Sequence, residues 1–176
     1  MNKKKVFSWT LYDWANSAFA TTVMAGFFPI FFEKYWSNPE LVNQSTFYLG
    51  VSNSVGSLIV AMMAPFLGAI SDTGSTKKKF LFTFAFLGIL ATSLLWLVEQ
   101  GDWQLAATLY AVGAIGFASA NVFYDSLLPS VSKKSEFDFV SSLGYSMGYL
   151  GGGVLSVSYT HLRAHETLRY LVCRLL

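Results

Sequence analysis

The stretch "YDWANSAFATT" places a carboxylate and several polar side chains inside a long apolar segment near the N-terminus. Asp13, Asn16 and Ala20 follow one another at spacings of three and four, so they share one face of a helix. A carboxylate in the middle of a bilayer costs about 2.5 to 3.5 kcal/mol, and such residues usually face a polar path or a polar partner. Asp13 and Asn16 are therefore predicted to line a path for a polar solute. Two other interpretations stay open: Asp13 lies close enough to the interface to stay in water or caps the helix, and Asn16 or Ser17 forms an interhelical hydrogen bond.

A second polar group lies where a later apolar segment ends. Asn121, Tyr124 and Asp125 are close together in "ASANVFYDSLLP". They indicate either a helix end in water or part of a gate, and we place Asn121 with the path residues.

Other site chemistry finds little support in the sequence. The histidines His161 and His165 and the single cysteine, Cys173, all lie in the last 19 residues, and no Gly-x-x-x-x-Gly-Lys phosphate loop or serine nucleophile elbow is present. A lone cysteine cannot form an internal disulfide or a cysteine-based metal cluster. We therefore expect no catalytic residues, no metal and no cofactor, and we expect that the protein is not an enzyme.

The composition indicates that these polar side chains lie on transmembrane helices. Hydrophobic residues make up 53% of the 176 residues and charged residues 12%, with a mean hydropathy of +0.46. A helix needs about 20 apolar residues to cross a bilayer. Five segments reach this length, and we predict an all-α membrane protein with five transmembrane helices. The predicted spans are 6–32, 47–70, 80–98, 103–124 and 139–157.

The lysines indicate the orientation of these spans. Eight of the nine lysines before residue 158 lie in the N-terminus, in the loop after the second span and in the loop after the fourth. Positive loops stay on the cytoplasmic side, so a cytoplasmic N-terminus in the cell membrane is predicted. Because the lysines form short clusters between apolar spans, they indicate loops and not a nucleic-acid surface.

Small residues recur every four positions within the spans, most clearly at Gly144, Gly148 and Gly152. Helices in lipid associate through close backbone approach across such faces. These three glycines are predicted to be helix-packing positions.

The loop "GAISDTGSTKKKF" joins the second and third predicted spans. It resembles the signature loop of the major facilitator superfamily, Gly-x-Leu-x-Asp-x-x-Gly-Arg-Lys, with Gly68, Ile70, Asp72 and Lys77 on the matching positions. Ser75 and Thr76 depart from the pattern, where the family usually has Gly and Arg. The resemblance implies that Asp72, with Lys77 and Gly68, helps to hold a cytoplasmic gate shut, with the Asp at a helix N-terminus. A solvated turn with lysines that only set the topology is the alternative.

Three further stretches narrow this resemblance. "YDWANSAFATTVMAGFFPIFF", "FASANVFYDSLLP" and "SSLGYSMGYLGGG" are similar to the branch related to the autophagy-linked vacuolar amino-acid effluxer. The similarity extends to about Leu155. It implies a secondary transporter that moves a small polar solute, such as an amino acid, by alternating access.

The same resemblance implies that the five spans are an incomplete N-terminal half of a twelve-helix fold, whose missing C-terminal half would be the partner of this fragment in the lipid bilayer. Two other function classes stay open. One is a membrane enzyme or accessory subunit, for which Tyr124 and Asp125 are the nearest polar cluster. The other is a small membrane scaffold that is complete at 176 residues.

The last stretch, residues 158–176, differs from the rest of the chain because it contains all three arginines. It resembles the translated read-through of a sequencing-library adapter, and we expect it to be a non-native tail after the transmembrane bundle of residues 1–157. The alternative is a basic amphipathic helix on the membrane surface.

Overall fold

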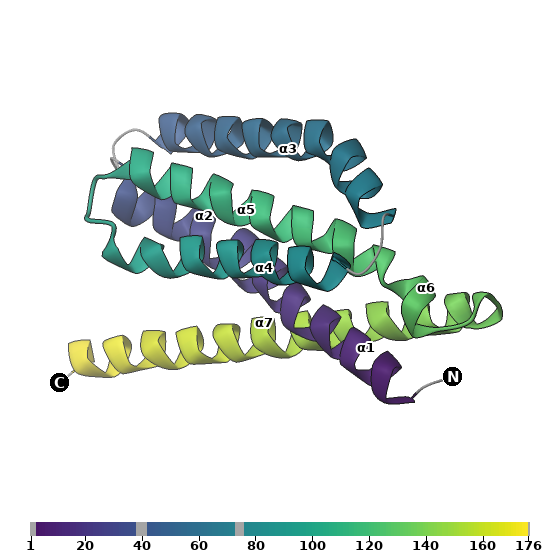
Figure 1. Cartoon of the computed structure of the whole chain (residues 1–176). Coiled ribbons are helices and arrows are strands. Elements are labelled where there is room, and N and C mark those ends of the chain that lie inside the picture. Colours follow the sequence, from purple (N-terminus) through teal and green to yellow (C-terminus); the bar gives the residue numbers. More distant parts are fainter. Residues whose placement is uncertain (1–2, 38–41, 73–75, 176) are drawn as a thin grey trace. The chain divides into compact units, whose positions relative to one another are not determined.

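The computed structural model describes residues 3–37, 42–72 and 76–175, with side chains for all of these except 42–45, 71–72 and 162–175. Within these ranges every regular element is a helix (Figure 1). The prediction of an all-α membrane protein is confirmed.

Four helical segments are long and apolar enough to cross a membrane. They are Lys3–Trp36, Thr46–Ile70, Lys77–Leu97 and Trp103–Ser126, and each overlaps one of the first four predicted spans. The chain is therefore a multi-pass membrane protein. The fifth predicted span, 139–157, lies inside α7 (Phe137–Leu175), which is not among these four segments. That span stays a prediction. Helix α7 continues without a break through most of the stretch after residue 157.

The chain divides into two compact units, Met1–Phe28 with Ser135–Leu176 and Pro29–Lys134. In the first unit, α1 (Lys3–Ala18) crosses α7 (Figure 1). The first span then changes its helical geometry, because residues Phe19–Phe27 form the π-helix η1. π-Helical geometry is rare in proteins, and its usual form is a single turn, which is frequently found at functional sites.

The first span ends in the second unit, where it continues from α2 (Phe28–Phe31) into the π-helix η2 (Phe32–Trp36). This unit also contains α3 (Val42–Asp72), α4 (Lys77–Leu94), η4 (Leu95–Leu97), α5 (Trp103–Ser126) and α6 (Leu128–Val131). Helix α5 packs against both α3 and α4 and lies between them (Figure 1). Helix α3 bends near its end, and Pro65 explains the bend because it removes one backbone hydrogen bond.

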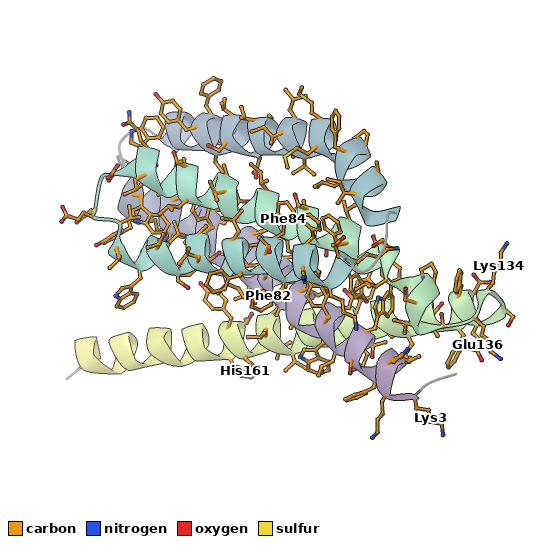
Figure 2. The ribbon with its side chains drawn as sticks, viewed as in Figure 1. Lys3, Phe82, Phe84, Lys134, Glu136 and His161 are labelled. Atoms are coloured by element: carbon orange, nitrogen blue, oxygen red, sulfur yellow. The ribbon has the colours of Figure 1, made fainter. Side chains whose placement is uncertain are left out.

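Aromatic rings fill the contact between α4 and α5. Phe123 of α5 is fully buried and stacks against Phe80 and Phe84 of α4, with ring centroids 5.2 and 5.9 Å away. Figure 2 shows Phe84 together with Phe82, which lies two residues earlier on α4 and is 71% exposed. One face of α4 therefore packs on α5, and the opposite face is apolar and open, as suits contact with lipid.

Hydrogen bonds fix the connection from η4 to α5. Trp36 Nε1 donates to the carbonyl oxygen of Val98 at 3.3 Å, and the amide of Gly101 donates to the carbonyl of Tyr35 at 3.1 Å. Gly101 has a φ of +89°, which favours glycine. Asp102 then caps α5 by accepting a hydrogen bond from the amide of Leu105. This loop is therefore held to the end of the first span.

Candidate functional site

Polar side chains of the first span lie where α1 and η1 pack on α7. Asp13 is half-buried, and its Oδ1 accepts a hydrogen bond from Ser17 Oγ at 3.4 Å. Gly148 of α7 is packed against this pair: a Cβ atom added there would lie 3.3 Å from Asp13 Oδ1 and 2.6 Å from Ser17 Oγ. The missing side chain of Gly148 thus makes room for a carboxylate inside an apolar span.

One helical turn further along, Thr21 continues the same line. Its hydroxyl lies 3.0 Å from the carbonyl oxygen of Ser17 and 3.4 Å from that of Gly152 on α7. Residues 13, 17 and 21 are four apart, so they form one ridge of the helix, which we call the polar ridge (Asp13, Ser17 and Thr21). The polar ridge packs on a strip of α7 that has almost no side chains.

Two of the predicted packing glycines, Gly148 and Gly152, lie on that strip, next to Asp13, Ser17 and Thr21. Gly144, Gly148 and Gly152 are all buried. The structure adds Gly151, where a Cβ atom would collide with the carbonyl oxygen of Trp14. The run of glycines in "GYLGGG" could have indicated Gly151 as a packing residue. A search for glycines four residues apart misses it, because that spacing picks only one glycine in each turn.

The predicted path residues come from both units. Asp13 and Asn16 are half-buried on α1, whereas Asn121 is half-buried on α5 in the second unit. Asp13 also belongs to the polar ridge that packs on α7 with Ser17 and Thr21. Whether Asp13, Asn16 and Asn121 line one path stays a prediction.

The predicted gate residues lie around the connection between α3 and α4. Lys77, at the start of α4, donates from Nζ to the carbonyl oxygen of Ser126 at the end of α5, at 3.0 Å. A cation suits this position because the last carbonyls of a helix carry partial negative charge. Asp72 is the last residue of α3, and its side chain lies outside the described residues, as do positions 73–75. Gly68 has open space where a side chain would begin.

A polar contact that the sequence reasoning missed joins α3 to α5. The hydroxyl of Tyr110, which is only 5% exposed, forms a hydrogen bond with the side chain of Asn53. An amide inside a predicted span needs a partner from a neighbouring helix. Asn53 alone could therefore have indicated such a contact, although not its partner.

Metal-ligating side chains do not gather in the described part of the chain: no three His, Cys, Asp or Glu residues come together there. The expectation that the protein uses no metal or cofactor remains an expectation.

Comparison with known proteins gives a family match. The family described as "Vacuole effluxer Atg22 like" matches residues 39–138. An uncharacterised transporter of the major facilitator type from Bacillus subtilis is 37% identical over 169 residues, which is 94% of this chain and 40% of that protein. Autophagy-related protein 22 from Coccidioides immitis is 24% identical over 172 residues, covering 73% of this chain and 28% of that protein.

The chain therefore spans about 40% or less of the length of these curated relatives. No solved structure gives a significant match to it.

Proposed function

The chain belongs to the family of vacuole effluxers like Atg22, and on this premise we propose that it acts in a secondary transporter of the major facilitator superfamily. The proposed activity is the movement of a small polar solute, such as an amino acid, by alternating access between the two sides of the cell membrane. The relative from Bacillus subtilis, whose name gives the transporter type, supports the activity class. The relative from Coccidioides immitis, an autophagy-related protein 22, supports placement in the effluxer branch of that superfamily.

The observation that carries the proposal is the polar ridge within the first span. The segment Lys3–Trp36 is apolar enough to cross a membrane, yet Asp13, Ser17 and Thr21 lie on one ridge of it. Asp13 follows residue 6, where the first predicted span begins, by seven residues, which is about 10 Å along a helix and places it inside the hydrocarbon region. Ionisable groups at that depth are typical of solute and ion pathways.

The proposed gate lies at the cytoplasmic ends of α3, α4 and α5. Lys77 ties the start of α4 to the end of α5, which would make these two helices move together. Asp72 would then act from the end of α3 on a helix N-terminus in the remaining part of the transporter. This assignment includes a cytoplasmic N-terminus, as the lysine distribution predicts.

Counterflow in proteoliposomes tests the proposal. The protein, expressed from its genomic reading frame, is reconstituted with one unlabelled amino acid inside, and entry of the same labelled amino acid is followed for each member of a panel. Saturable exchange of at least one solute is expected. Asp72→Asn should lower the exchange, whereas Asp138→Asn, which removes an exposed acid at the start of α7, should not. Lack of exchange for the whole panel, in vesicles shown to contain folded protein, would contradict the proposed function.

A further inference from the structure

One face of α4 is turned away from its partner helix. Gly88 is buried on the side of α4 that meets Gly113 of α5. On the opposite side, Phe82, Phe86 and Ile89 are 71%, 54% and 64% exposed. Their spacings of four and three place them on one helical face. We call these three residues the outer face of α4.

Different side chains lie at the two ends of the outer face. Lys78, four residues before Phe82, is exposed at its beginning, and Lys79 is exposed beside it. Trp96, seven residues after Ile89, is 91% exposed at its end. A lysine stem can lie along apolar surface while the ammonium group stays in the polar layer, and tryptophan is enriched at membrane–water interfaces. Both ends therefore carry side chains that suit an interface.

The length of the outer face matches the thickness of a bilayer. Lys78 and Trp96 are eighteen positions apart, which is about 27 Å along a helix, and the hydrocarbon core is about 30 Å thick. Between these ends, the rings of Phe82 and Phe86 are nearly parallel, with centroids 6.1 Å apart and planes at 14°. They form a continuous apolar surface along which an acyl chain can lie.

The lysine end of the outer face is positively charged. Lys77 donates to a backbone carbonyl of α5, whereas the side chains of Lys78 and Lys79 make no hydrogen bond or ion pair within the described part of the chain. The two connections at this end of the unit, residues 72–79 and 125–134, contain five lysines and two aspartates, which gives a net charge of +3. A negatively charged headgroup therefore suits this end.

Lipid fits the outer face better than another helix does. Helices that associate inside a bilayer meet through small residues, which allow close backbone approach. The glycine of α4, Gly88, already faces α5, and the outer face presents large side chains instead. Phe82 and Phe86 would hold the backbone of a second copy of the chain at a distance.

We propose that the outer face of α4 binds an anionic phospholipid, with the phosphate at Lys78 and Lys79 and one acyl chain along Phe82 and Phe86. The inference goes beyond the proposed transport function and does not depend on it. Each lysine near an anionic membrane surface strengthens binding about fivefold, which corresponds to about 1 kcal/mol. Two lysines therefore give a preference of about thirtyfold for an anionic over a zwitterionic lipid.

Photocrosslinking in nanodiscs tests the site. The protein, expressed from its genomic reading frame, is purified into phosphatidylcholine nanodiscs that contain a trace of phosphatidylglycerol with a photoreactive group on one acyl chain. Mass spectrometry then identifies the labelled residues. We expect this probe to label the outer face, and to do so much more than the corresponding phosphatidylcholine probe. Lys78→Gln combined with Lys79→Gln should remove this preference, a loss of about thirtyfold.

Lys133→Gln combined with Lys134→Gln is the matched control, because it removes the same charge from two lysines that are exposed at another connection. This variant should keep the preference at the outer face. Higher salt should weaken the preference of the unmodified protein, because the ionic contact is screened, and this measurement needs no variant.

Four outcomes would overturn the proposal. They are equal labelling of the outer face by the two probes, an equal loss of preference in the two double variants, a preference that does not change with salt, and an unlabelled outer face in nanodiscs where Phe66 of α3, which is 70% exposed, is labelled. The last result would show that protein and not lipid covers the outer face. Size-exclusion profiles identify a variant that has not folded.

Discussion

Gly116 of α5 lies directly on the backbone of Gly88 in α4. A Cβ atom added to Gly116 would come 2.8 Å from the amide nitrogen of Gly88 and 2.8 Å from the carbonyl oxygen of Phe84. Both are backbone atoms, so neither can turn away. The two helices therefore approach as closely as they do because both residues are glycines.

Gly116→Ala should destabilise the protein by about 1 to 3 kcal/mol, because the extra methyl group forces α4 and α5 apart. Thermal unfolding in detergent measures the effect. Gly50→Ala is the control, since nothing lies within 4 Å of a Cβ atom at Gly50. Equal unfolding temperatures for the two variants would show that the close crossing does not exist.

The glycine strip of α7 allows a comparison between two near neighbours. Gly151→Ala should destabilise the contact with α1, because the new methyl group would collide with the backbone of Trp14, whereas Gly153 has open space. We expect a loss of about 1 to 3 kcal/mol for Gly151→Ala and little change for Gly153→Ala. Denaturant unfolding followed by tryptophan fluorescence reports this directly, since Trp14 is at the contact. If Gly153→Ala were the more damaging variant, the register of α7 on α1 would be wrong.

Lys77 and Lys78 share one helical turn but differ in their contacts. Lys77 donates to the carbonyl of Ser126, and Lys78 is exposed. Lys77→Met should therefore lower the stability by about 1.5 to 3 kcal/mol, the usual net value of a hydrogen bond from a charged group. Lys78→Met removes the same charge and should have almost no effect. If both variants lost a similar amount of stability, the cause would be the lost loop charge and not the hydrogen bond between α4 and α5.

Trp36 tests the loop at the other end of these helices. It is 2% exposed, and its indole nitrogen donates to the carbonyl of Val98. Trp36→Phe should cost about 1 to 3 kcal/mol, because this carbonyl loses its donor in a buried place. Trp96→Phe serves as the control, since Trp96 is 91% exposed. Differential scanning calorimetry should give a lower unfolding temperature for Trp36→Phe than for Trp96→Phe. Equal unfolding temperatures would argue against the hydrogen bond.

Much of the fold could be predicted because lipid imposes a simple rule on composition and length. The apolar runs around Thr46–Ile70, Lys77–Leu97 and Trp103–Ser126 are each long enough to span, and the structure shows a helix over each. The changes within a span are harder to foresee. Nothing in "FATTVMAGF" distinguishes a π-helix from an α-helix, because both suit the same apolar residues.

The candidate site could be predicted only in part. Asp13 is conspicuous in the sequence because it is a carboxylate in an apolar segment. Thr21 is not conspicuous there, and only the structure shows that its hydroxyl lies beside the carbonyl of Gly152. That contact depends on the register between two helices more than 100 residues apart in the chain, and helix periodicity contains no information on register. The same holds for Gly88, whose importance comes from Gly116.

Alternating access is the central claim, and α3 offers two positions for its most direct test. Gly50 and Gly68 are eighteen residues apart and lie near opposite ends of the span. Both have open space for a side chain. Single cysteines at these positions, in a background in which every other cysteine of the expressed protein is replaced by serine, are labelled with a membrane-impermeant maleimide from each side of the membrane. A transported solute should slow labelling at one position and speed it at the other. Unchanged rates at both positions, for a solute that exchanges in counterflow, would contradict the account.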